Sequence, residues 1–299
     1  MLPSTGIQTS ENPFIGKFRL LVLHVGCLAA FFVQPTPALL SLMLVSWFVR
    51  TFGWEGGLHR YFAHRSYKTS RAFQLVLACL GAASGQRGPL WWAAYHRAHH
   101  RYADTARDPH APRNKGRFYA YVGWLHDKRN CDTDLDAVRD LSRYPELVWV
   151  NKYHYLFPYL SMVGIYALGQ WTDLFGRHAG LAAVVWGFFI ATWLSLQGSL
   201  LINAFAHGPR PGWLGYRNFS TPDTSHNLWP ISLLSLGSSW HNNHHRYMNC
   251  ARAGIRWWEL DLTYLTLKLL AALGLVWDLR EVPEQEREEE VERKRFGEV

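Results

Sequence analysis

The sequence is poor in cysteine and in charge, and both shortages restrict what the protein can be. Only 4 of its 299 residues are cysteine, and they lie far apart with no Cys-x-x-Cys pair. This excludes a disulfide scaffold, a zinc ribbon and an iron–sulfur site, and it fits free thiols in a reducing compartment. Charged residues make up 18% of the chain and hydrophobic residues 48%, which excludes disorder.

Several signatures of metal and cofactor proteins are also missing. The sequence has no His-Glu-x-x-His and no Glu-x-x-His, which speaks against a zinc protease helix and against a soluble di-iron bundle. It has no glycine-rich dinucleotide fingerprint and no His-Pro-Gly-Gly haem motif. The first ten residues are polar and no small-residue cleavage site follows, so we expect no cleavable signal peptide.

What the sequence does contain is apolar runs, arranged in two pairs. Each pair is joined by a short link and predicts a hairpin of two membrane-spanning helices. A fifth apolar stretch, residues 73–83, is too short to span and is expected to lie in the membrane interface or to re-enter the membrane. The four runs cover residues 18–33, 38–49, 155–169 and 181–206.

The positive charges lie on one side of this hydropathy map. The net charge of +8 and pI of about 9.4 suit either nucleic acid or a membrane surface. The turn at residues 34–37 has no Lys or Arg, and the link at residues 170–180 has only Arg177. This asymmetry favours four helices with both termini in the cytoplasm, and it disfavours nucleic acid. A soluble protein with short buried helices remains the alternative, because the mean hydropathy is only −0.13.

The predicted fold is therefore an all-α membrane protein with a cytoplasmic helical cap. Residues 1–16 form an N-terminal cytoplasmic segment, residues 17–283 one domain, and residues 284–299 a charged tail. Within the domain, the hairpins cover residues 18–53 and 155–206. The cap covers residues 54–154 and 207–283.

Histidines gather in the predicted cap in three groups, with a fourth element, Asn203-Ala-Phe-Ala-His207, at the end of the last apolar run. Residues three or four apart share a helix face, so His96 and His100 or His99 can point at one site, as can His241 with His244 and His245. His59 and His64 are five apart, which suggests a helix end or a bulge. The groups are His59 and His64; His96, His99 and His100; and His241, His244 and His245.

Nine clustered imidazoles indicate metal chemistry. Neutral imidazole binds zinc, copper, iron and nickel, and nine ligands are too many for one ion but suit two. We therefore expect a pair of redox metals at a membrane surface. A zinc or copper transporter is the alternative, although transport ligands would lie within the spans. Four isolated histidines are expected to be structural: His24, His126, His154 and His178.

The pattern resembles the membrane fatty-acid desaturases of the stearoyl-CoA type. The order HxxxxH, HxxHH, NxxxH, HxxHH matches, as do Gly88-Pro-Leu-Trp-Trp92, Asp104-Thr-Ala-Arg-Asp108-Pro-His110, Gly123-Trp124 and Trp257-Trp258-Glu259-Leu-Asp261. The resemblance covers about residues 15–283. It implies a di-iron site whose ligands are His59, His64, His96, His99, His100, His207, His241, His244 and His245, with Asn203 acting through a water. It does not say which histidine serves which iron.

The resemblance also implies an activity. Such enzymes use O2 and two electrons to remove two vicinal hydrogens from a saturated acyl chain, typically between C9 and C10. The expected substrate is a fatty acyl-CoA or a related acyl thioester or lipid. An oxygen-inserting hydroxylase with the same metal centre is the competing reading. No fused electron carrier is visible, so we expect a separate ferredoxin or cytochrome b5-like donor, and a bacterial inner-membrane location with the active site on the cytoplasmic side.

Further roles follow from position within the resemblance. Gln86, Trp92 and Ser199 match residues of the acyl tunnel. Lys128 and Arg129 match a basic pair that faces the CoA phosphates, and phosphate contact by paired cations is chemically reasonable. Asp104 and Asp108 are expected to hydrogen-bond to ligand imidazoles.

The chain departs from the pattern at several places. Arg87 and Ala94 stand where animal enzymes place residues that contact CoA, and Leu200 stands where they have Trp. These changes leave CoA, acyl carrier protein and intact lipid open as head groups. Bacterial relatives usually read Gly-Glu-Gly-Trp before the third group, but this chain reads Gly237-Ser238-Ser239-Trp240, so an acidic residue is missing. His226 stands where an Arg is usual. These changes suggest a divergent subfamily.

Overall fold

The computed structural model describes residues 12–209 and 212–283. The expected charged tail lies outside these ranges, and so does the expected N-terminal segment apart from residues 12–16. The described chain is mostly helical, as predicted, with two small two-stranded sheets.

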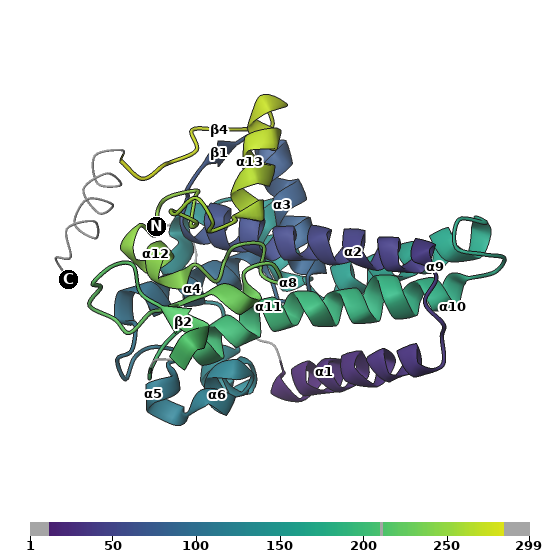
Figure 1. Ribbon diagram of the computed structural model, residues 1–299, viewed down its shortest axis with the longest axis horizontal. Helices are drawn as coiled ribbons and strands as arrows, with labels where there is room; N and C mark the ends of the chain where they lie inside the picture. Colours follow the sequence, from purple (N-terminus) through teal and green to yellow (C-terminus); the bar gives the residue numbers. More distant parts are fainter. Residues whose placement is uncertain (1–11, 210–211, 284–299) are drawn as a thin grey trace.

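Four helical segments form the elongated half of the molecule (Figure 1). Their ends have clear local causes: Asn12 and Thr36 accept hydrogen bonds from the first-turn amides of α1 and α2, and a proline begins each helix. The segments are α1 (Pro13–Leu28) with the 3₁₀ turn η1 (Ala29–Phe31); α2 (Pro37–Phe52) with the π-helical η2 (Gly53–Ala63); α9 (Leu156–Trp171); and α10 (Gly180–Ala183), the π-helical η6 (Val184–Ile190) and α11 (Ala191–Phe205).

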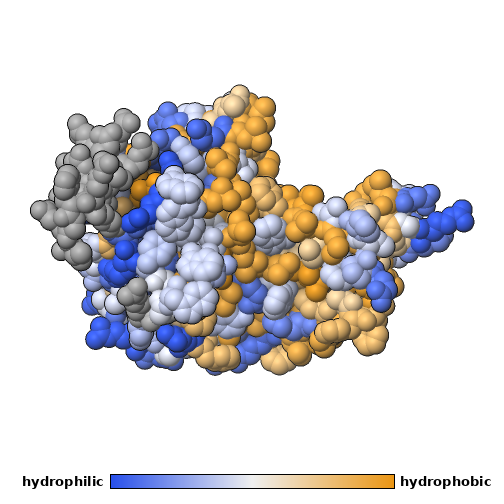
Figure 2. Space-filling view, in the orientation of Figure 1, coloured by the Kyte–Doolittle hydropathy of each residue, from blue (hydrophilic) through white to orange (hydrophobic). Residues whose placement is uncertain are grey.

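Three of these segments are long and apolar enough to cross a membrane: Pro13–Phe31, Pro37–Ala63 and Gly180–Phe205. Helix α9, with 16 residues, reaches about 24 Å at 1.5 Å per residue, which is short of a hydrocarbon core of about 30 Å. Apolar residues dominate the surface of the elongated half (Figure 2). On α1, the Phe18 and Leu21 side chains are 57% and 59% exposed, which suits contact with lipid.

The other end of the molecule is the cap, which is built from short elements on both sides of α9–α11 in sequence. Helix α3 crosses the direction of α2 and matches the expected short apolar stretch (Figure 1). The cap helices are α3 (Arg71–Ala83), α4 (Pro89–Tyr102), α5 (Pro112–Lys115), α6 (Arg117–Tyr121), α7 (Arg139–Ser142), α8 (Pro145–Lys152), α12 (His241–Arg246) and α13 (Leu262–Ala272). The 3₁₀ turns are η3 (Gly123–His126), η4 (Lys128–Asn130), η5 (Asp136–Val138), η7 (Gly212–Leu214) and η8 (Trp229–Ile231).

Two antiparallel strand pairs tie distant cap segments together. Strand β1 (Lys68–Thr69) pairs with β4 (Val276–Trp277), with Lys68 opposite Trp277. Strand β2 (Gly215–Tyr216) pairs with β3 (Asn227–Leu228), with Gly215 opposite Leu228. The first pair joins the segment after the first histidine group to the end of the described chain.

Segment η2 lies at the centre of the cap core. All eleven of its residues are buried, and Leu58 and Phe62 are completely so. It packs closely on α3, because a Cβ at Gly53 would stand 2.5 Å from the Leu80 carbonyl oxygen and one at Gly57 would stand 3.1 Å from that of Leu77. The end of the long α2–η2 helix is thereby fixed in the cap rather than in the elongated half.

Candidate metal centre

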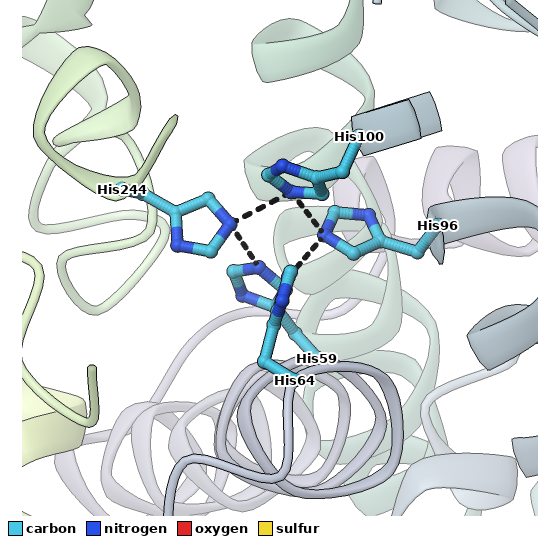
Figure 3. A group of neighbouring side chains, drawn as sticks. All are labelled: His59, His64, His96, His100 and His244. Carbon is cyan, nitrogen blue, oxygen red and sulfur yellow. Dashed lines mark hydrogen bonds between the residues drawn. The ribbon is translucent and has the colours of Figure 1, made fainter. Parts of the chain in front are cut away.

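The nine predicted histidines converge in two neighbouring clusters. The five-histidine cluster contains His59, His64, His96, His100 and His244, and Figure 3 shows their rings pointing at one another. The four-histidine cluster contains His99, His207, His241 and His245. In each cluster, ring nitrogens from all members lie within 4.8 Å of one another. The clusters abut, since the rings of His100 and His245 stack with centroids 4.4 Å apart.

A π-helical segment explains the five-residue spacing of the first group. The His64 amide donates to the His59 carbonyl at 3.2 Å, an i to i+5 bond typical of π-helix. A wider turn brings residues five apart onto one face, so both rings reach the same cluster: His64 lies 2.8 Å from His96, and His59 lies 3.0 Å from His244, measured between Nε2 atoms. The predicted bulge is confirmed in this form.

The two HxxHH groups each serve both clusters. On α4, His96 and His100 are four apart and their Nε2 atoms lie 3.0 Å from each other. On α12, His241 and His245 are likewise 3.0 Å apart. The remaining member of each group crosses to the other cluster, because neighbouring residues on a helix point about 100° apart. The pairing of His96 with His100 agrees with the expected spacing, whereas His241 shares a cluster with His245 but not with His244.

Carboxylates hold the far sides of four of the rings. Each accepts from, or pairs with, an Nδ1 atom, so the Nδ1 nitrogen carries the proton and the Nε2 lone pair faces the cluster. The pairs are His59 with Glu55 at 2.7 Å, His99 with Asp108 at 3.0 Å, His207 with Asp104 at 3.3 Å, and His245 with Asp223 at 2.9 Å.

Burial keeps several of the cluster rings neutral, so their ring-nitrogen lone pairs are available to a cation. Burial lowers the pKa of the rings of His96, His100, His241, His244 and His245 well below its ordinary value. Neutral nitrogens about 3 Å apart cannot all donate to one another. The buried Nε2 of His99 has no protein hydrogen-bond partner. This donor set fits metal ions, which bind neutral imidazole through the same lone pairs.

The two aspartates that the sequence singled out pair with rings of the four-histidine cluster, Asp108 with His99 and Asp104 with His207. Burial alone would raise the pKa of Asp108, but the His99 ring outweighs it and the pKa falls below its usual range. Burial alone would also raise the pKa of Asp104, but hydrogen bonds from His207 and Thr224 outweigh burial and lower this pKa below its usual range. Both carboxylates stay ionised and act only as acceptors.

A tenth buried imidazole lies beside the four-histidine cluster. The His110 ring stacks on His99, with centroids 4.3 Å apart, and contacts Trp124. Burial lowers the pKa of His110 to about 3, so the ring is neutral. Its sequence motif was noted, but no role was assigned to it.

A cavity of about 370 Å³ leads from the clusters into the elongated half. Its wall includes His59, His96 and His241, and also Asn203, which belongs to neither cluster. Three residues expected in the acyl tunnel lie together in this wall: the Gln86 Oε1 atom accepts from Ser199 at 3.0 Å and from Trp92 Nε1 at 3.4 Å. His126 and His154, expected to be structural, also line it.

The basic pair lies elsewhere. Lys128 and Arg129 are exposed and are not part of the cavity wall, and Arg129 pairs with Asp127 at 2.6 Å. The departures from the family pattern face inwards. Arg87 lines the cavity and donates to the Asn130 carbonyl at 3.0 Å, and Leu200 is buried in the wall.

Other departures are buried structural positions. Ala94 lies in the cap core, and His226 is buried on the segment that pairs with the third histidine group. Sequence reasoning missed two carboxylates, Glu55 and Asp223. Glu55 could have been found, because it precedes His59 by four residues in a helical stretch. Asp223 has no local signal, since it lies 22 residues before His245.

Comparison with known proteins agrees with this geometry. Residues 18–277 match the fatty acid desaturase family, and this span includes both histidine clusters and the cavity. The chain therefore belongs to the fatty acid desaturases, which are oxidoreductases.

Individual relatives differ in the substrate that their names give. The chain is 33% identical over 282 residues to the sn-1 stearoyl-lipid 9-desaturase of Anabaena variabilis, covering 92% of this chain and 97% of the relative. It is 33% identical to the hex-5-enoyl-(acyl-carrier protein) acetylenase of Moorena producens, over 81% of this chain and 76% of the relative. It is 33% identical to the acyl-CoA 5-desaturase AL21 of Anemone leveillei, over 86% and 76%.

Proposed function

We propose that this protein is a di-iron membrane desaturase that introduces a cis double bond at position 9 of a saturated fatty acyl chain. The observation that carries the proposal is the pair of imidazole clusters opening onto a long apolar cavity. The balanced reaction takes –CH2–CH2–, O2, two electrons and two protons to –CH=CH– and two waters. Bound iron would supply the oxidising power that an unactivated methylene requires, since such a methylene offers no acidic proton.

We propose that the two histidine clusters supply the ligands. One iron would be held by His59, His64, His96, His100 and His244. The other would be held by His99, His207, His241 and His245, with Asn203 at the shared wall contributing through a water.

The remaining contribution of the chain is positioning. Trp92 stacks on His96 with centroids 4.6 Å apart, and it is tied through Gln86 to Ser199 in the same cavity wall. These linked side chains would hold one pair of methylenes beside the metal ligands. Holding the reacting methylenes in place lowers the reaction barrier through orientation, without a side chain that activates them chemically.

We further propose that the acyl chain is presented on a membrane lipid. Two features favour lipid over CoA. The cavity wall includes Phe18, Val22 and Tyr159, whose side chains are exposed on the apolar half of the molecule. The basic pair that would face CoA phosphates lies off the wall, with Arg129 already neutralised by Asp127.

For topology, we propose four spans with the cap in the cytoplasm. The distribution of Lys and Arg supports this orientation. Helix α9 packs against α10 and η6 as the outgoing arm of a second hairpin. Cysteine labelling in intact cells tests it: residues placed at 36 and 173 should react with an impermeant thiol reagent, whereas one placed at 113 should react only after lysis.

Electrons are proposed to come from a separate acidic carrier, either a ferredoxin or a cytochrome b5-like protein. Next to the histidine-bearing α4, the cap exposes a group of cations that could attract it: Arg101, Arg107, Arg113, Lys115 and Arg117. Charge complementarity of this kind raises association rates and weakens with salt.

Expression in a desaturase-deficient bacterial host tests the activity. Fatty-acid analysis should show a new cis-9 monoene, and purified protein should carry about two irons per chain. A hydroxy fatty acid without unsaturation would contradict desaturation, and bound zinc without redox activity would favour metal handling. Supplying stearoyl-phospholipid vesicles and stearoyl-CoA in parallel distinguishes the two head groups, because only the stearoyl-phospholipid should be converted.

A further inference from the structure

We propose that Glu55 is a positioning residue for the five-histidine cluster, and that it supplies the carboxylate which the segment before the third histidine group lacks. The inference rests on the proposed di-iron function. It explains a departure from the family pattern that the sequence alone left unexplained, namely Ser238 in a place where an acidic residue is usual.

The contacts of Glu55 are those of an orienting carboxylate. One oxygen accepts from His59 Nδ1 at 2.7 Å, and the other accepts from Arg60 Nε at 2.8 Å. The Glu55 side chain is completely buried. Because the Arg60 guanidinium balances its charge, Glu55 remains an acceptor, which obliges His59 to protonate Nδ1 and to turn the Nε2 lone pair toward the cluster.

Glu55 has no substitute within the five-histidine cluster. In residues 12–209 and 212–283, the carboxylates that hydrogen-bond or pair with cluster rings are Glu55, Asp104, Asp108 and Asp223, and the three aspartates all contact the four-histidine cluster. Glu55 alone therefore fixes the orientation of a ring that faces His64, His96 and His244.

Position 238 lies next to the Glu55 carboxylate. Ser238 is buried, and its side chain lies close to the Glu55 carboxylate. A carboxylate at position 238 would thus meet Glu55 in a buried site, where two like charges in contact are strongly unfavourable. The site can therefore hold one acidic residue but not two. We infer that the carboxylate usual at position 238 has been replaced, in this chain, by the carboxylate of Glu55.

The test compares four full-length proteins purified in detergent and loaded with ferrous iron under anaerobic conditions: wild type, E55T, E55T/S238E and D261N. Iron per chain, the rate of iron loss to excess chelator and the unfolding temperature of the iron-free protein are measured. E55T should lose iron about 10–100-fold faster, the usual effect of removing such a partner. E55T/S238E should recover most of the retention.

D261N is the matched control. Asp261 also pairs with Arg60, at 3.0 Å, but touches no histidine of either cluster. Its loss should lower the unfolding temperature while iron retention stays near that of the wild type. If D261N loses iron as fast as E55T, the role of Glu55 is merely to balance Arg60 and the inference is wrong.

Two other results would overturn it. They are unchanged iron retention in E55T, and no recovery in E55T/S238E although the iron-free protein is folded. If E55T does not fold, E55Q takes its place: it keeps an acceptor oxygen but loses the charge, so a smaller increase in the rate of iron loss is expected, and none would contradict the proposal. If the wild-type chain binds no iron, both this inference and the proposed function are wrong. If it binds two irons, the proposed function stands whatever the Glu55 variants show.

Discussion

His99 and His100 are consecutive in the chain but belong to different clusters. His100 Nε2 lies 3.0 Å from His96 in the five-histidine cluster, whereas the His99 ring packs against His207 and His245 in the other. His244 and His245 are divided in the same way. Adjacent side chains on a helix point apart, so one short helix between two metals can serve both.

Replacing His244 by alanine should abolish the unsaturated product while the protein still enters the membrane. The variant removes a ring whose Nε2 lies 2.9 Å from His100 and 3.0 Å from His59. Lipid analysis and iron content measure the effect. His178→Ala is the matched control, since that ring lies in the α9–α10 link and contacts Gln170. Full activity in H244A would contradict the ligand assignment.

Replacing Asp108 by asparagine should weaken iron binding by about 10–100-fold. An amide can present a donor to His99 Nδ1 and so favour the wrong tautomer. Chelator competition measures the change. Asp136→Asn, at a surface pair with Arg139, should leave the affinity as it is. Equal iron affinities in D108N and D136N would show that Asp108 does not orient His99.

Replacing Gly53 by alanine should lower the free energy of unfolding by about 1–3 kcal/mol. The new Cβ would stand 2.5 Å from the Leu80 carbonyl oxygen, and that backbone cannot move aside easily. Gly164 in α9 has no atom within 4 Å of such a Cβ, so Gly164→Ala should be neutral or stabilise by roughly 0.5–1 kcal/mol. Thermal unfolding in detergent compares them, and equal stability would contradict the close η2–α3 packing.

Asp140 should make stability depend on pH only in acid. Burial alone would raise its pKa, but hydrogen bonds from Arg97 and Arg65 lower it to about 2. A depressed carboxyl pKa contributes stability that is complete above its unfolded value, about 3.9, and that is lost as the pH falls through the folded value. The unfolding temperature of the wild type should therefore exceed that of D140N at pH 7, and the gap should close toward pH 2. A constant gap would contradict this origin.

Replacing Ser199 by phenylalanine should block the cavity. The ring would fill the space where Ser199 now donates to Gln86, so desaturation of long chains should fall at least about tenfold while iron content is unchanged. Ser199→Ala removes the hydroxyl without filling the space and should keep most of the activity. Product profiles of both variants check this, and normal activity in S199F would place the substrate elsewhere.

Much of the site could be predicted because its signals are local. The three histidine groups, the short apolar α3 and the unusual geometry between His59 and His64 all follow from spacing along the chain. The division of His99 from His100 could not be predicted, because it depends on where the opposite cluster lies. The partner of His245, Asp223, comes from a loop folded back over α12, which no sequence period encodes.

Other predictions came from the resemblance to the desaturase family, and the structure places only some of these residues at the cavity. Gln86, Trp92 and Ser199 meet in one wall because the Gln86 side chain, in the turn before α4, hydrogen-bonds to Trp92 on α4 and to Ser199 on α11. Lys128 and Arg129 are exposed on η4. The 16-residue length of α9 leaves the fourth span a proposal. Spacing along the chain could thus place side chains near the histidine groups, but not a partner such as Asp223 from a distant loop.

The π-helical segment between Gly53 and Ala63 limits which mutations this protein can accept in evolution. Tyr61, Phe62 and Ala63 can be exchanged for residues that pack as well, whereas Arg60 is held by its pairs with Glu55 and Asp261. Gaining or losing a single residue would swing His64 by about 100° out of register with its partners. The first histidine group is therefore constrained in length more than in composition, and viable variants should tolerate point changes there but no insertion or deletion.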